Sequence, residues 1–231
     1  MSKIRMSKRV SRPPTKALVS QAIAIEAKPR GEVIRYAVDL IDSVHSDGKL
    51  PKIFASTDEK LTDHGYYERQ PDDSPWQIVI SPNGRHPELT CVHEIGHFLD
   101  HLALGRAGHW ASISSRSLSG WREAVEQTQA VQELRGRKQG PLPVTLPSGV
   151  SLQVFVEQRV LDYALGPLEL FARSYAQYIT RASQDKVLLV QMAAEIDTLE
   201  WQVYPLQWQD KDFTPIYDQL ELLLRKKGWR P

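Results

Sequence analysis

The stretch His93-Glu94-Ile95-Gly96-His97 constrains this chain more than any other. It lies in a segment that we predict to be helical from about Glu88 to Leu104, because apolar residues recur there at helical spacing. Two histidines four positions apart share one face of a helix, so both imidazoles can bind the same metal ion. A glutamate beside the first histidine is placed to take a proton from a water on that ion. The pattern predicts a hydrolytic zinc centre carried by a helix.

Two neighbours of the histidines qualify this interpretation. Gly96 costs about 1 kcal/mol in a helix relative to alanine, which predicts that another element packs closely against it. Cys91 lies two positions before His93 and is either a buried, inert thiol or a thiolate ligand in an inactive form; its apolar surroundings favour the buried thiol. The alternative for the whole segment is a core helix with two surface histidines.

A third ligand is expected much later in the chain. Gly166 breaks one segment, and Pro167 suits the first turn of a new helix, which places Glu169 in that turn. Phe171 and Ala172 follow on an apolar helix, and a carboxylate buried there needs a partner. Zinc held by two histidines is such a partner, since two histidines, a glutamate and a water form a recurrent catalytic set. The alternative is an acid stabilised by the helix dipole alone.

Composition narrows the class of protein. The chain has 231 residues, 41% of them hydrophobic, and a formal net charge of +1, which suits one globular domain and gives no general reason to expect nucleic-acid binding. Its single cysteine allows no intrachain disulfide, which fits a reducing compartment. We expect neither a secretory signal nor a membrane-spanning segment, and therefore a cytoplasmic protein, with delivery by a dedicated secretion system or a virion left open.

The chain divides into a tail and one domain. Residues 1–16 are basic and contain Pro13-Pro14, so we expect a disordered tail, either simply solvated or in weak contact with nucleic acid or an acidic partner. Residues 17–231 are expected to form a single α+β domain, with a catalytic core at about 31–181 and a C-terminal helical part at 186–231. The predicted elements are a helix at 31–46, a small sheet of two or three strands at 51–55, 65–68 and 76–81, and helices at 121–135, 167–180, 186–199 and 215–227, with loops at 105–120 and 136–149.

Two short blocks resemble a known family. His93-Glu94-Ile95-Gly96-His97-Phe98-Leu99-Asp100 and Glu169-Leu170-Phe171-Ala172-Arg173-Ser174-Tyr175 resemble the gluzincin-type metallopeptidases, most closely the catalytic domain of anthrax lethal factor and the metallopeptidase domains of phage and mobile-element polyvalent proteins. The resemblance is confined to roughly residues 64–181. It implies a zincin-like fold with a small mixed sheet, an active-site helix and a second helix that carries the third ligand.

The resemblance also assigns roles to residues. It implies that His93, His97 and Glu169 bind one Zn²⁺ and that Glu94 is the general base. Tyr163 matches a tyrosine that helps to stabilise the oxyanion, although its spacing is about one residue short, and Tyr175 is the alternative.

Other positions near the two blocks are more ambiguous. Asp100 matches an acid that can orient a metal ligand, or it is a solvated acid. Position 173 is arginine where lethal factor has an acid, so a role there is in doubt. His101 is a further possible ligand, but a straight helix carries it too far along the axis. In zincins the strand before the metal helix often forms an open edge that binds peptide, which suggests residues 76–80, unless these form an ordinary sheet strand.

These features predict a zinc-dependent endopeptidase that acts on a peptide or protein substrate. The alternative is a phage or mobile-element accessory or effector protein that uses a zinc-bound zincin fold mainly to bind a partner. Fold-level likeness does not choose between them.

Overall fold

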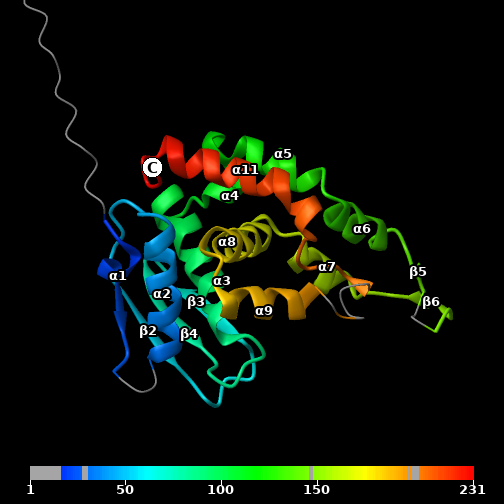
Figure 1. Cartoon of the computed structure of the whole chain (residues 1–231), viewed down its shortest axis with the longest axis horizontal. Coiled ribbons are helices and arrows are strands. Elements are labelled where there is room, and N and C mark those ends of the chain that lie inside the picture. The colour runs from blue at the N-terminus through cyan, green and yellow to red at the C-terminus, as the bar shows by residue number, and fades with distance from the viewer. Residues whose placement is uncertain (1–16, 28–30, 146–147, 197, 199–202) are drawn as a thin grey trace, which may run out of the picture.

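The computed structural model describes residues 17–27, 31–145, 148–196, 198 and 203–231, and the predicted basic tail, residues 1–16, lies outside this range. The described part is a mixed α+β structure, as expected (Figure 1). A four-stranded sheet and α2 (Glu32–Val44) lie on one side, and a group of longer helices builds the rest. No described helix combines the length and the apolar character needed to cross a membrane.

The sheet is mixed and has the strand order β1-β2-β4-β3. The strands are β1 (Ile23–Ile25), β2 (Ile53–Thr57), β3 (Gly65–Arg69) and β4 (Pro75–Ile80). β4 pairs in parallel with β2 and antiparallel with β3. The expectation that residues 76–80 form an open edge is therefore wrong, because both sides of β4 are paired. β3, which continues into β4 through a short turn, forms that edge of the sheet instead.

One face of the sheet is in the core. Along β2, Ile53 and Ala55 are buried while Phe54 between them is 48% exposed, which is the alternation of a strand covered on one side only. On β4 the buried residues are Ile78, Val79 and Ile80. Before β1 the chain forms a short helix, α1 (Val19–Ala22), which runs directly into the strand.

The predicted metal helix is α3 (Pro87–Leu99). Proline at its start and Glu88 in its first turn are favourable N-terminal residues, and its buried side packs on β3 and β4. The helical chain continues to Leu104 as predicted, but Asp100–Leu104 is a π-helical turn. A π turn rotates the following side chains relative to an α-helix.

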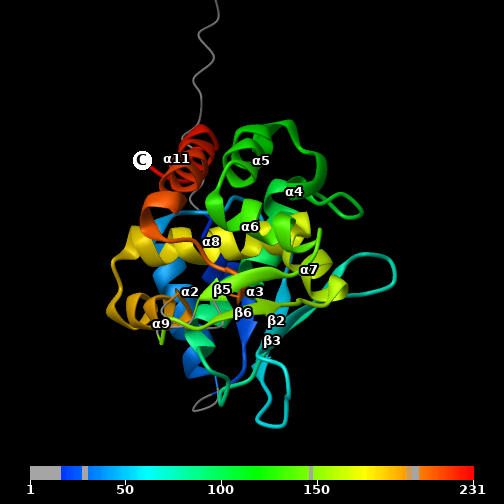
Figure 2. The ribbon, with the colours of Figure 1, turned by 90° about the vertical axis from the view of Figure 1, so that its right-hand side faces the viewer.

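Helix α8 (Pro167–Ser183) is the centre of the molecule (Figures 1 and 2). It begins at the predicted Gly166-Pro167 boundary, and every residue from Glu169 to Thr180 is buried. It packs against α3 on one side and against α11 (Asp210–Lys226) on the other. In the described part of the chain, the main hydrophobic cluster includes residues from Val19 to Leu224 around these helices, and a smaller cluster contains Leu134, Leu161 and Ala164.

The region around the central helices differs from the prediction in several places. The loop 105–120 contains α4 (Ala111–Ser114) and a 3₁₀ turn at Arg116–Leu118, and the helix predicted at 121–135 is broken into α5 (Ser119–Glu126) and α6 (Gln129–Arg137). The loop 136–149 contains β5 (Leu142–Thr145), which pairs with β6 (Ser151–Val154) in a hairpin that projects from the body (Figures 1 and 2). The last helix begins at Asp210, before the Pro215 at which its start was predicted. Two helices complete the described part, α7 (Gln158–Ala164) and α9 (Lys186–Ile196).

Candidate metal centre

Three of the predicted ligands converge where α3 meets α8. The potential ligand atoms of His93, His97 and Glu169 all lie within 4.8 Å of one another. The Nε2 atom of His93 is 3.4 Å from one carboxylate oxygen of Glu169, and that of His97 is 3.6 Å from the other. Among the described residues, no other group of three such side chains is arranged in this way. The structure therefore brings the two motif histidines to the acid predicted 70 residues later.

Two of the separations between these atoms suit a shared metal ion. Zinc bonds of about 2.0–2.1 Å at tetrahedral angles place two ligand atoms about 3.3 Å apart. The observed nitrogen–oxygen separations of 3.4 and 3.6 Å are close to that value. They are longer than direct hydrogen bonds, which are about 2.7–3.2 Å for this pair of atoms. Two imidazoles and a carboxylate are also ligands that zinc binds readily, so the residues present fit a zinc ion.

Close packing of the two helices makes this approach possible. A Cβ atom added at Gly96 would lie 3.0 Å from Cδ1 of Tyr175 and 3.2 Å from Cα of Ala172. The structure confirms the prediction that another element packs against Gly96, and that element is the ligand-bearing helix α8.

The electrostatics of the metal-free protein hold Glu169 ionised. Burial opposes a charge on this carboxylate, but the charge of His93, the close imidazole of His97 and the charge of Arg173 together place the pKa of Glu169 well below its usual range. Burial likewise disfavours protonation of His93, yet the Glu169 carboxylate outweighs it and raises the pKa of His93. Glu169 is thus an anion surrounded by groups that carry or accept positive charge.

The remaining predicted catalytic residues line a cavity next to these ligands. The cavity has a volume of about 720 Å³, and Glu94, Tyr163, His93 and Glu169 all contribute to its wall. Glu94 is itself buried on α3. Tyr163, on α7, is 66% exposed, but burial at its hydroxyl and the nearby carboxylates of Glu169 and Glu94 raise its pKa. Tyr163 is therefore both open to solvent and part of the cavity wall, close enough to the two acids to be affected by their charge.

Tyr175, the alternative to Tyr163, is directed elsewhere. Its side chain is buried between α8 and α2, and its hydroxyl is 2.9 Å from Nε2 of His45. It contributes to the core and not to the wall of the cavity that contains Glu94. Of the two tyrosines, the structure brings only Tyr163 to the predicted ligands.

Asp100 is fully buried and hydrogen-bonded to Ser112. Its two carboxylate oxygens accept bonds from the amide and the hydroxyl of Ser112, at 2.7 and 2.6 Å. Burial raises the pKa of Asp100 to about 6, and these hydrogen bonds and the nearby His97 partly oppose the shift. The solvated-acid alternative is therefore wrong. The observed bonds tie the end of the metal helix to α4, and an orienting effect of Asp100 on His97 stays a prediction.

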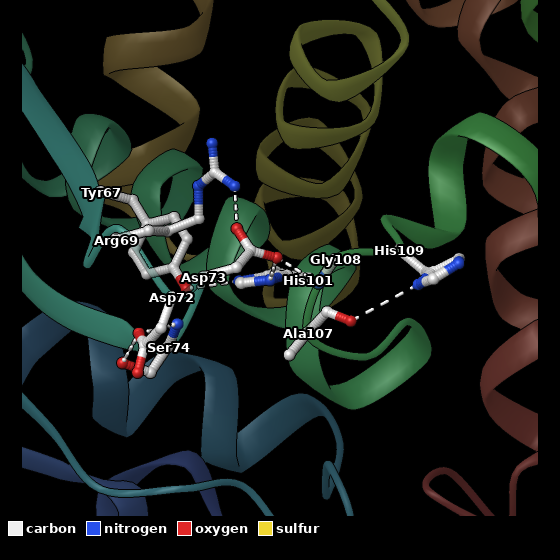
Figure 3. Close-up of polar contacts among 9 residues, drawn as sticks. All are labelled: Tyr67, Arg69, Asp72, Asp73, Ser74, His101, Ala107, Gly108 and His109. Carbon is white, nitrogen blue, oxygen red and sulfur yellow. Dashed lines mark hydrogen bonds and ion pairs between the residues drawn. The ribbon is translucent and has the colours of Figure 1, made fainter.

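His101 is not part of the group of three ligands and belongs to a separate polar network (Figure 3). Its Nδ1 lies 2.8 Å from the hydroxyl of Tyr67, and its Nε2 lies 3.0 Å from a carboxylate oxygen of Asp73. The same oxygen of Asp73 accepts a bond from the amide of Gly108, and Arg69 binds the other oxygen. Because both ring nitrogens are engaged, His101 connects the β3–β4 turn to the metal helix and does not join the ligand group.

Cys91 and Arg173 complete the surroundings of the ligands. The thiol of Cys91 is fully buried, and burial raises its pKa, which agrees with the inert interpretation. Arg173, where sequence reasoning left no role, is buried one helical turn after Glu169 and forms part of the cavity wall. Its Nε lies 3.6 Å from a carboxylate oxygen of Glu169. The sequence signal for it was a departure from the pattern of the resembling family, which has an acid at this position.

Comparisons of the chain with protein-family models, with curated proteins and with solved structures gave no significant match. The interpretation of the site therefore depends on its own geometry and chemistry.

Proposed function

We propose that this protein is a zinc-dependent metalloendopeptidase of zincin-like fold. The observation that carries the proposal is the convergence of His93, His97 and Glu169 within 4.8 Å, beside a cavity whose wall includes Glu94. The likeness of the two sequence blocks to gluzincins supports the same conclusion.

The side chains of the site suit peptide hydrolysis. A zinc ion on the three ligands would supply a Lewis acid that lowers the pKa of a bound water and polarises a carbonyl. Glu94, next to His93 on α3, accepts the proton of the attacking water and passes it to the leaving amine. Tyr163 donates its hydroxyl proton in a hydrogen bond to the developing oxyanion. The raised pKa of Tyr163 keeps that donor protonated at neutral pH.

An extended substrate has a place to bind at β3. On one side this strand pairs with β4, and at its start Gly65 lies so close to α3 that an added Cβ would be 2.9 Å from the Thr90 side chain. Gly65 also lines the cavity that contains Glu94. A peptide that added to the other side of β3 by main-chain hydrogen bonds would therefore run past the ligands.

The test is cleavage by the zinc-loaded protein of a complex peptide library, with new termini identified by mass spectrometry. Glu94→Gln is the matched control, because it keeps the ligands and removes the base. We expect new termini with the wild type and a rate about 10²–10⁴-fold lower with the variant. Equal cleavage by the two proteins would show that Glu94 is not the base.

The same experiment distinguishes the peptidase from the second candidate function, a protein that only binds a partner. A protein that binds zinc and retains peptides or a protein partner, yet produces no new termini under any condition in which they are bound, would be a binding protein on a zincin-like fold. That result would refute the peptidase while leaving the metal centre intact.

A further inference from the structure

Arg173 is a cation built into the metal centre. Its side chain is 3% exposed, and a guanidinium stays protonated in proteins. Its Nε lies 3.6 Å from the Glu169 carboxylate and 3.4 Å from the main-chain oxygen of the same residue. The guanidinium also donates to the main-chain oxygens of Ala164 and Leu206 and lies 5.6 Å from the ring of Trp208. The charge is thus held firmly beside the ligand acid.

A buried carboxylate without a counter-charge is unfavourable, and Arg173 supplies that charge when no metal is bound. A metal ion between His93, His97 and Glu169 would supply it a second time. Two cations would then share one buried carboxylate, and like charges in a poorly solvated site repel each other. Arg173 therefore acts in opposite directions on the metal-free and metal-bound forms.

We propose that Arg173 is a resident counter-ion of Glu169, which stabilises the metal-free protein and thereby weakens metal binding. The inference rests on the proposed zinc centre and deepens it. It distinguishes Arg173 from a residue that merely packs, because a packing residue stabilises both forms of the protein equally.

The experiment uses the full chain and zinc alone as the probe, with Arg173→Gln, which removes the charge, and Arg173→Lys, which keeps it. The zinc dissociation constant is measured by competition with a chromophoric chelator, and the melting temperature is measured with and without zinc. For Arg173→Gln we expect a lower melting temperature than the wild type when no zinc is present. We also expect a zinc dissociation constant at least about tenfold lower than that of the wild type, and therefore a larger rise in melting temperature when zinc is added. Arg173→Lys should stay within about threefold of the wild-type dissociation constant.

The matched control is Arg181→Gln on the same helix, where the guanidinium lies 4.6 Å from the ring of Tyr217. It should lower the melting temperature equally with and without zinc. Zinc binding by Arg173→Gln that equals or falls below that of the wild type would overturn the proposal, as would a variant that stays unfolded in excess zinc. A wild type that binds no zinc at all is a different result, because it would refute the metal centre itself.

Discussion

The packing of α3 against α8 at Gly96 gives a prediction that links a single methyl group to metal binding. In Gly96→Ala the new Cβ would lie 3.2 Å from Cα of Ala172 and 3.0 Å from Cδ1 of Tyr175. Ordinary carbon–carbon contacts are about 3.5–4.0 Å, so the helices must separate by a few tenths of an ångström. A main-chain atom cannot turn aside as a flexible side chain can. The shift would move Glu169 away from the two histidines.

The size of the effect follows from two opposing contributions and from the tolerance of metal bonds. Overpacking costs about 1–3 kcal/mol, while alanine regains about 1 kcal/mol over glycine in a helix, so we expect a net loss of about 0–2 kcal/mol in unfolding free energy. Ligand distances in a metal site tolerate only about 0.2 Å. A displacement of a few tenths of an ångström should therefore weaken zinc binding by about 10–100-fold, the range seen when the supports of a ligand are removed.

The assay is zinc competition with a chelator, together with urea unfolding of the metal-free protein. Gly120→Ala on α5 is the matched control, because its Cβ would meet only the flexible end of the Gln219 side chain. The control should bind zinc as the wild type does. If Gly96→Ala also bound zinc with wild-type affinity and unfolded at higher urea, close packing at this position would not position the ligands.

Three further predictions test other parts of the structure. Burial, with Asp42 nearby, raises the pKa of Asp47 to about 7, so the folded protein holds a proton that the unfolded chain releases above about pH 4. The contribution of Asp47 to the unfolding free energy should therefore fall as the pH rises from 4 to 7. Asp47→Asn should remove this contribution to the pH dependence. At pH 8 the variant should be more stable than the wild type by up to about 4 kcal/mol, measured by urea unfolding. Tyr163→Phe should lower kcat about 10²–10³-fold on any peptide that the wild type cleaves, with unchanged zinc affinity, while Tyr175→Phe leaves kcat unchanged; equal effects of the two would argue against an oxyanion donor in the wall of the cavity. His101→Ala should keep its zinc by elemental analysis but lose about 1–3 kcal/mol of stability, since it removes a fully buried imidazole and its hydrogen bonds to Tyr67 and Asp73. Loss of zinc from this variant would indicate that His101 is a metal ligand.

Local sequence patterns predicted the two helices that matter most. The Gly166-Pro167 boundary fixed the start of α8, and apolar spacing around His93 predicted the helical stretch that ends at Leu104. Gly96 also gave a correct prediction of close contact, although not of its partner. These features depend on neighbouring residues along the chain, so they are visible without a structure.

Features set by contacts between distant segments were not predictable in the same way. Strand order depends on which strands meet in space, so β4 was predicted to be an edge strand. The short strand β1 was not among the predicted strands. The π-helical turn at Asp100–Leu104 left no clear sequence signal, and neither did the contacts of His101 with Tyr67 and Asp73. Arg173 was visible only as a departure from the family pattern, and its ion pair with Glu169 emerged from the packing of α7 and the segment at Leu206 around it.

The most direct test of the metal centre is the zinc content per chain, by elemental analysis, of the wild type and of Glu169→Ala. Glu169 is the ligand that joins the two helices, so its loss separates a three-ligand centre from a pair of histidines on one helix. We expect about one zinc per chain in the wild type and a content that is lost or greatly reduced in the variant. Full zinc in both proteins would show that the third ligand is another residue, and no zinc in either would show that the histidine pattern is part of an ordinary core helix.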